Sequence, residues 1–290
     1  MTPSRPYVGR FAPSPTGRLH LGSMVAAVAS HLDARAHGGT WLVRMEDLDP
    51  PREVQGAASD ILRTLEAFGL EWDGEVLYQH TRHSAYSRVL EELKSRDMAF
   101  GCGCTRRELA ATGGLKVYPG TCRHGVPAGK EARSWRLKTE DLGQLTWTDR
   151  FCGKQQFLYA ELGDFVLRRA DGYWAYHLAV VVDDEEQGVT DIVRGADLLD
   201  STSYHVALQQ ALGFRTMAYA HVPVVTNEWG QKLSKQSHAV PVETSDASAV
   251  LSSVFEHLGL NGISLDSPHV MLHQATDAWR QRFVKGRDGG

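Results

Sequence analysis

The sequence lacks an apolar run long enough to cross a membrane. Its longest purely apolar runs, Met24 to Ala29 and Leu178 to Val182, are far shorter than the roughly 20 residues that a spanning helix needs. The first residues, Met1 to Pro6, also lack the apolar region of a signal peptide. We therefore expect a cytoplasmic protein without membrane contact.

A strong excess of charge of either sign is also missing. The 31 Lys and Arg residues nearly balance the 35 Asp and Glu residues, which leaves a net charge of −4. No overall field therefore draws this protein to nucleic acid. An RNA partner would have to be bound by local basic patches, such as Arg106–Arg107, Arg168–Arg169 or the basic residues between 280 and 287. Such clusters are more often solvated surfaces.

Cysteine is scarce, but most of it is concentrated in one region. The four cysteines are Cys102, Cys104, Cys122 and Cys152. In a protein expected in a reducing compartment, the first three favour a metal over disulfides. Thiolates in a Gly-rich segment suit tetrahedral zinc. The fourth ligand could be Tyr118, whose phenol ordinarily titrates near 10, or His124, which is chemically easier. We expect Cys152 to be a free buried cysteine.

The first part of the chain alternates between expected strands and expected helices. The strands cover 7–11, 40–45 and 76–78, and the helices cover 21–35, 53–68 and a segment carrying Tyr86, Val89, Leu90 and Leu93. In the second helix, Val54 is expected on the buried face with Ile61 and Leu65. This order predicts an α/β fold with a doubly wound parallel sheet.

The alternation breaks at Met98 and resumes at Tyr173. The first part of this interruption is rich in glycine and shows neither the helical nor the strand spacing of apolar residues. Its second part is strand-like. Afterwards helices are expected at 176–182 and 198–212, a strand near Ile192, and short helices such as 247–258 at the end. We therefore divide the chain into 1–97, the first half of a nucleotide-binding core; 98–172, an inserted zinc-containing module; 173–240, the second half of the core; and 241–290, a small C-terminal helical region.

The stretch from Arg10 to Met24 joins an expected strand to an expected helix. Pro13 and Pro15 fix φ and remove two N–H donors, so neither a sheet nor a helix can continue through it. His20 and Gly22 then fall at the helix entrance, where free N–H groups suit a nucleotide phosphate. Gly22 has no Cβ and leaves room for a ribose or a base.

A second stretch, Lys232-Leu-Ser-Lys-Gln236, lies in a polar segment late in the chain. Lys232 and Lys235 flank a serine, and such a pair suits a leaving group that gains negative charge. Taken alone, a solvated lysine loop is the more ordinary interpretation. The combination with the His20 stretch is what points to nucleotide chemistry.

Together the two stretches resemble the two signatures of class I aminoacyl-tRNA synthetases. Further motifs resemble the glutamyl subgroup: Arg10-Phe-Ala-Pro-Ser-Pro-Thr-Gly, Arg44-Met-Glu-Asp-Leu-Asp, Tyr176-His-Leu-Ala and Val189-Thr-Asp-Ile-Val-Arg-Gly. The resemblance extends from about Tyr7 to His238 and implies a Rossmann-type core. It implies that ATP, supplied with Mg²⁺, is bound by His20, Gly22 and Lys235. Lys232 would assist as pyrophosphate departs.

An enzyme that activates an amino acid must hold its ammonium and carboxylate groups in one orientation. Arg10 and Arg194 could each donate two hydrogen bonds to a carboxylate, and Glu46 could pair with the ammonium. The resemblance assigns glutamate to Arg10, Ala12, Ser14, Glu46, Tyr176 and Arg194. One residue departs from the pattern, because Val180 stands where the subgroup has an asparagine. We therefore expect one polar contact to be lost and glutamate binding to be weaker.

The expected reaction is attack of the glutamate carboxylate on the α-phosphate of ATP, which gives glutamyl-adenylate and pyrophosphate. The spacing Cys-x-Cys…Tyr-x-x-x-Cys resembles a shorter subgroup of this family, whose members transfer glutamate to the queuosine base in the anticodon loop of tRNA(Asp). The resemblance implies one structural zinc, bound by Cys102, Cys104, Tyr118 and Cys122. Separately, we expect a monomer.

Two alternatives remain for the whole chain. A truncated glutamyl-tRNA synthetase would charge a tRNA 3′ end, and a catalytically silent relative would only bind tRNA. The expected absence of a large domain after Lys235 counts against the first alternative, because such enzymes grip the anticodon with a separate domain. The intact His20 and Lys235 signatures count against the second.

Overall fold

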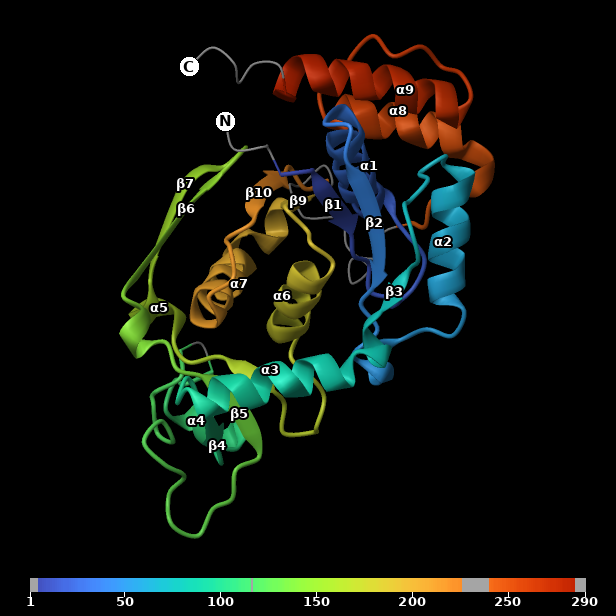
Figure 1. Ribbon diagram of the computed structural model, residues 1–290. Coiled ribbons are helices and arrows are strands. Elements are labelled where there is room, and N and C mark those ends of the chain that lie inside the picture. Colours follow the sequence, from blue (N-terminus) through green and yellow to red (C-terminus); the bar gives the residue numbers. More distant parts are fainter. Residues whose placement is uncertain (1–4, 116, 226–239, 285–290) are drawn as a thin grey trace. The chain divides into compact units, whose positions relative to one another are not determined.

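The computed structural model describes residues 5–115, 117–225 and 240–284 of the chain (Figure 1). The chain forms two compact units. Unit 1 comprises Met1–Tyr78, Val189–Leu198 and Met217–Gly290, and unit 2 comprises Gln79–Gly188 and Leu199–Thr216. Among the described residues, every helix is too short or too polar to cross a bilayer.

Unit 1 is built on parallel strands. They are β1 (Val8–Phe11), β2 (Thr40–Met45), β3 (Leu77–Tyr78), β9 (Asp191–Gly195) and β10 (Ala218–Val222). β2 pairs in parallel with both β1 and β3, and β9 pairs in parallel with β10. β9 lies next to β1, as shown by the hydrogen bond from Thr190 N to Val8 O at 2.9 Å. The spatial order β3-β2-β1-β9-β10 confirms the predicted doubly wound parallel arrangement.

The helices of unit 1 cover these strands and extend the core. They are α1 (Leu21–Ala36), α2 (Ala57–Ala67), α8 (Ala247–His257) and α9 (Pro268–Trp279), with a π-helical turn at Arg280–Val284 and short 3₁₀ helices at Pro50–Arg52, Ala196–Leu198 and Thr244–Asp246. α1 packs against β1 and β9 and also against α8 and α9 (Figure 1). The buried carboxylate of Asp33 in α1 accepts hydrogen bonds from Tyr7 Oη at 2.5 Å and Trp279 Nε1 at 2.8 Å. The last helix is thereby part of the core of unit 1.

Unit 2 combines helices with short antiparallel sheets. Its helices are α3 (His83–Ser95), α4 (Arg106–Ala111), α5 (Tyr159–Leu162), α6 (Tyr176–Glu186) and α7 (Leu199–Leu212), with 3₁₀ turns at Gln79–Thr81 and Glu140–Leu142. One sheet has the order β4 (Ala99–Cys102), β5 (Ser134–Leu137), β8 (Val166–Arg168), and β6 (Gln144–Asp149) forms a hairpin with β7 (Gly153–Leu158). α3 and α6 are joined by the buried Asp183, which accepts from Gln79 Nε2 at 2.8 Å and Tyr86 Oη at 2.6 Å.

Three sequence-based expectations about elements were wrong. α2 begins at Ala57 rather than Glu53, because the prolines form a 3₁₀ turn and Gly56 adopts a left-handed φ of +80°. Val54 is therefore outside the helix and 52% exposed. The Gly-rich region does contain regular elements, β4 and α4, and α4 starts with a capping box between Thr105 and Glu108.

Candidate functional site

The loop after β1 delivers His20 to the start of α1. His20 is the N-cap residue, with extended backbone (φ −119°, ψ 172°), and its Nδ1 accepts a hydrogen bond from Ser23 N at 3.3 Å. Its Nε2 lies 3.2 Å from Ser23 Oγ. The first turn of α1 carries no acidic residue, so nothing there neutralises the positive end of the helix dipole. This arrangement suits a phosphate group.

The chain returns to this loop immediately after the lysine signature. Lys232 and Lys235 lie outside the described residues, but Val242 N donates to Leu19 O at 3.0 Å, and Pro241 forms a β-bridge with His20. Two further side chains reinforce this contact. Arg18 donates to both oxygens of Glu243, at 3.0 and 3.1 Å, and lies 3.3 Å from Asp60. The segment Pro241–Glu243, which follows the second signature in the sequence, is thus anchored beside the first signature.

The predicted carboxylate donors of unit 1 come from neighbouring strands. Arg10 on β1 and Arg194 on β9 are both 4% exposed, and β1 lies beside β9. Glu46 follows β2, and its N–H donates to Pro13 O at 2.9 Å. This hydrogen bond places Glu46 next to the loop that carries Ala12 and Ser14, residues that are half-buried and exposed respectively.

Sequence reasoning overlooked Arg44, which lies beside the predicted site residue Glu46. Arg44 is completely buried in β2, and its Nη2 lies 3.7 Å from Glu46 Oε1. A charged residue inside an otherwise apolar strand was the available signal, since a buried arginine needs a partner. Arg44 therefore supports the carboxylate of Glu46, which was predicted to pair with the substrate ammonium.

Arg194 is held by two hydrogen bonds. Its Nε donates to His221 Nε2 at 3.1 Å, and its Nη2 donates to Leu198 O at 3.1 Å. Its guanidinium carbon also lies 5.7 Å from the centre of the Tyr219 ring. Sequence reasoning missed His221 as well, because a histidine in an apolar strand gives no sign of what it faces across the sheet.

Tyr176, the remaining predicted glutamate residue, belongs to unit 2. It is the first residue of α6, half-buried, with its ring centre 5.4 Å from that of His205. Val180, one turn further along α6, is completely buried. Its aliphatic side chain therefore contributes to the core of unit 2.

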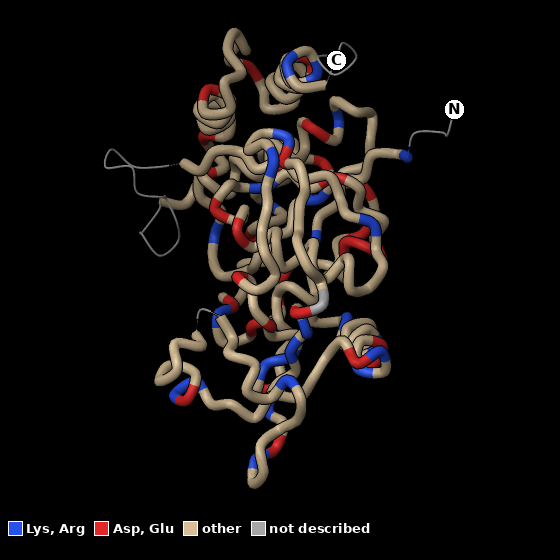
Figure 2. Tube along the Cα trace, turned by 90° about the vertical axis from the view of Figure 1, so that its left-hand side faces the viewer, with Lys and Arg blue, Asp and Glu red and all other residues tan. Residues whose placement is uncertain are grey.

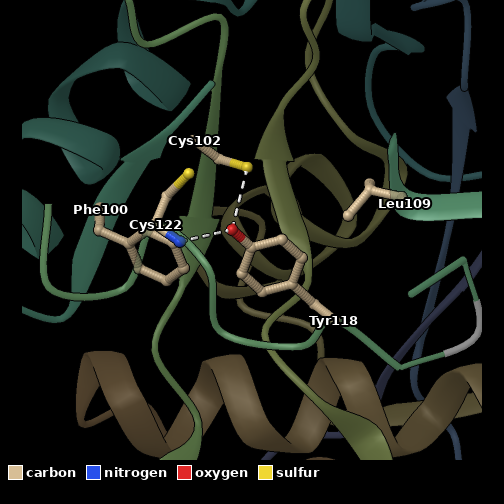
Figure 3. Close-up of a cluster of buried hydrophobic side chains, with 5 residues drawn as sticks. All are labelled: Phe100, Cys102, Leu109, Tyr118 and Cys122. Atoms are coloured by element: carbon tan, nitrogen blue, oxygen red, sulfur yellow. Dashed lines mark hydrogen bonds between the residues drawn. The ribbon is translucent and has the colours of Figure 1, made fainter. Parts of the chain in front are cut away.

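The predicted metal ligands of unit 2 form a compact cluster. The three sulfur atoms of Cys102, Cys104 and Cys122 all lie within 4.8 Å of one another. Tyr118 Oη lies 3.3 Å from the Cys102 sulfur and 3.6 Å from the Cys104 sulfur, and it accepts a hydrogen bond from Cys122 N at 2.9 Å (Figure 3). His124 is exposed and is not part of this group of ligand atoms. The cluster can hold one metal ion.

The surroundings of the cluster adjust its thiols. Burial raises the pKa of Cys102, but hydrogen bonding with Tyr118 and Arg136 outweighs burial and lowers it to about 7. Burial raises the pKa of Cys104, and burial together with the hydrogen bond to Cys102 raises that of Tyr118. A thiol close to ionisation at neutral pH is an accessible metal ligand. Cys152 lies outside the cluster, as expected, but it is exposed rather than buried.

Basic and acidic residues are interspersed along the tube, as the net charge suggests (Figure 2). Arg169, in one of the basic pairs considered for RNA, is bound to Asp171 at 2.6 Å. Arg106 and Arg107 are exposed on α4. The latter pair stays a candidate basic patch.

Comparisons with known proteins identify the family of this chain. A family model described as "tRNA synthetases class I (E and Q), catalytic domain" matches residues 7–274. This chain belongs to that family. The match confirms the resemblance predicted from the two signatures, and with it a synthetase catalytic domain of the ligase type. Such a domain uses ATP, an amino acid and tRNA.

Several relatives share one name. A protein from Chromobacterium violaceum, named glutamyl-Q tRNA(Asp) synthetase, is 59% identical over 258 residues, which cover 87% of this chain and 86% of that protein. One of the same name from Dechloromonas aromatica is 56% identical over 262 residues, 88% of this chain and 86% of that protein.

Solved structures of glutamate-tRNA synthetases share the fold of this chain. A glutamate tRNA ligase from Elizabethkingia meningosepticum, solved in complex with its amino acid, matches with a TM-score of 0.76 and 25% identity over 92% of this chain. A glutamate-tRNA synthetase from Elizabethkingia anophelis matches with a TM-score of 0.72 and 29% identity over 80% of this chain. The matches span 64% and 53% of those two chains.

Proposed function

We propose that this chain is a glutamyl-Q tRNA(Asp) synthetase. It activates glutamate with ATP and transfers it to the queuosine base at the wobble position of tRNA(Asp). The observation that carries the proposal is the identity of 59% and 56% to proteins of that name over most of both chains. The Cys-x-Cys…Tyr-x-x-x-Cys spacing and the cluster that it forms add independent support.

Activation requires the glutamate carboxylate to attack the α-phosphate of ATP, with pyrophosphate as the leaving group. His20 donates to phosphate oxygens at the start of α1, and Gly22 admits the adenosine. Lys235 stabilises the departing pyrophosphate with Lys232 nearby. Catalysis of this kind rests on positioning and on stabilising charge rather than on covalent help from the protein. Mg²⁺ accompanies the ATP.

Glutamate is held by charge complementarity. Arg10 and Arg194 receive its two carboxylates, and Glu46 pairs with its ammonium. The burial of both guanidinium groups supports this role, because a desolvated arginine binds a carboxylate more strongly than an exposed one. Ala12, Ser14 and Tyr176 complete the set of contacts predicted from the sequence.

One structural zinc ion would stabilise unit 2. Cys102, Cys104 and Cys122 supply three thiolates, and Tyr118 supplies the fourth ligand. The position of Tyr118 Oη against two sulfur atoms and the exposure of His124 favour the tyrosine. Zinc would lower the pKa of the phenol by its positive charge. Closure by four protein ligands leaves no open position for catalysis.

Transfer uses a hydroxyl of the queuosine cyclopentene diol as the nucleophile. The hydroxyl oxygen attacks the carbonyl carbon of glutamyl-adenylate, an ester forms, and AMP leaves. Proteins usually recognise RNA loops by taking splayed single-stranded bases into pockets, so the anticodon loop is an accessible target. We expect the enzyme to act as a cytoplasmic monomer.

The decisive experiment compares tRNA substrates. Glutamylation should persist on queuosine-containing tRNA(Asp) from which the 3′-terminal CCA has been removed. It should be absent from tRNA(Asp) that lacks queuosine but keeps its 3′ end. The opposite pattern would favour a truncated glutamyl-tRNA synthetase that charges the 3′ end. If both substrates bind but neither is glutamylated, the silent relative is the better description.

A further inference from the structure

Arg194 and His221 face each other across two parallel strands. They are direct register partners on β9 and β10, and they are only 4% and 1% exposed. Arg194 Nε lies 3.1 Å from His221 Nε2. Because guanidinium nitrogens can only donate, His221 Nε2 must be the acceptor. The imidazole is therefore neutral, with its proton on Nδ1.

The same face of the sheet restrains both side chains further. Tyr219, two residues before His221, stacks on its ring at 6.2 Å with an interplanar angle of 11°. Leu198 O accepts from Arg194 Nη2 at 3.1 Å. The hydrogen bonds to His221 Nε2 and Leu198 O fix the plane of the guanidinium group.

We propose that His221 is a positioning residue that orients Arg194 for the glutamate carboxylate. The inference rests on the proposed role of Arg194 in binding glutamate. If the substrate had to order a flexible arginine side chain, the loss of rotamer freedom would weaken binding. A guanidinium already fixed by His221 avoids that loss.

The choice of a neutral ring as the acceptor has a chemical reason. Two half-buried arginines elsewhere in the chain have their Nε bound by a carboxylate, Arg82 by Asp183 at 3.1 Å and Arg123 by Asp164 at 2.7 Å. A carboxylate at Nε would offset the positive charge that the substrate needs. A neutral imidazole fixes the orientation of Arg194 and adds no negative charge at that nitrogen.

The test is ATP–pyrophosphate exchange with glutamate, measured on the full chain without tRNA. His221→Leu should raise KM for glutamate about 10–100-fold, as expected for loss of a charge-assisted hydrogen bond. It should change kcat and KM for ATP by less than about 3-fold, because binding rather than chemistry is affected. His221→Gln should return KM for glutamate to within about 3-fold of wild type, since its amide oxygen can accept from Nε.

His31→Leu is the matched control, because His31 is another buried histidine of unit 1 and its Nδ1 has no hydrogen-bond partner among the described residues. It should leave KM for glutamate unchanged. An unchanged KM in folded His221→Leu protein, or a His221→Gln variant as impaired as His221→Leu, would overturn the proposal. If His221→Leu does not fold, the comparison passes to His221→Gln and the shorter His221→Asn. Only the former should keep a near-normal KM, and equal values would overturn the proposal.

Arg194→Ala separates this inference from the function on which it rests. If Arg194→Ala leaves KM for glutamate unchanged, the proposed pocket itself is wrong. If Arg194→Ala raises KM and His221→Leu does not, only the positioning role fails. The double variant should be no worse than Arg194→Ala alone, because His221 acts through Arg194.

Discussion

The cysteine cluster of unit 2 and the proposed adenylation site differ in how their side chains are brought together. The cluster takes Cys102, Cys104 and Cys122 from one stretch of chain inside one compact unit. The adenylation site needs residues from β1, the start of α1, β2, β9 and the lysine signature. Closing a short loop costs less entropy than joining distant segments. The cluster can therefore form locally, whereas the adenylation site depends on the completed sheet of unit 1.

Because the two sites are built differently, we expect substitutions in them to have different effects. A change in the adenylation signatures should affect chemistry and leave the fold intact. A change in the cysteine cluster should affect the stability of unit 2 first.

Lys235→Ala should reduce glutamate-dependent ATP–pyrophosphate exchange about 10²–10³-fold, as for loss of one preorganised donor in a transition state. The thermal unfolding temperature should stay close to that of the wild type, because the change removes charge stabilisation rather than packing. Lys154→Ala, at an exposed lysine of β7, is the control and should retain full exchange. Normal exchange in Lys235→Ala would remove the lysine signature from the mechanism.

Cys122→Ser should remove most of the zinc from the purified protein, which we expect to carry one ion per chain. Because zinc binding contributes folding free energy, the unfolding temperature should fall by about 5–10 °C. Exchange without tRNA, measured at low temperature, should fall far less than in Lys235→Ala. Cys152→Ser, at the exposed cysteine outside the cluster, should change neither zinc content nor stability. Full zinc occupancy in Cys122→Ser would show that the site is wrong.

His31 gives unit 1 a dependence on pH that the cluster does not share. Burial, with a smaller contribution from Arg35, lowers the pKa of His31 to about 3, against about 6.5 in an unfolded chain. Below pH 6.5 the unfolded state therefore binds a proton that the folded state does not. Stability is present above pH 6.5 and is lost as the pH falls toward 3, by about 2 kcal/mol between pH 7 and pH 5. Denaturant titrations at the two pH values should show this loss, and His31→Leu should remove it.

The smallest effect should distinguish the two possible fourth ligands. Tyr118→Phe should weaken zinc binding by at least about 10-fold, because loss of a ligand should cost no less than loss of a supporting contact of a metal site. His124→Ala should leave affinity unchanged, because this side chain is exposed and outside the cluster. Competition with a chromogenic chelator would measure both variants. Weakened binding in His124→Ala alone would reverse the assignment.

Much of the secondary structure followed from the sequence because its signals are local. Apolar spacing identified α3, whose Tyr86, Val89, Leu90 and Leu93 are all buried. Prolines and glycines located the loop before α1 and the end of that helix. The start of α2 was misplaced because the left-handed Gly56 and the turn at Pro50–Arg52 interrupt a period that looks continuous in the sequence. β10 was also missed as a strand, since only its apolar end was noticed.

Neighbouring residues were enough to predict most of the order of strands and helices, the two signatures and the grouping of cysteines. Which distant residues meet is set by the tertiary structure. It joins Asp33 to Trp279 and aligns Arg194 with His221 across β9 and β10. Strand register and the packing of α9 on α1 depend on contacts between segments far apart in the chain. A single sequence carries no local pattern that states which of its buried polar residues will face one another.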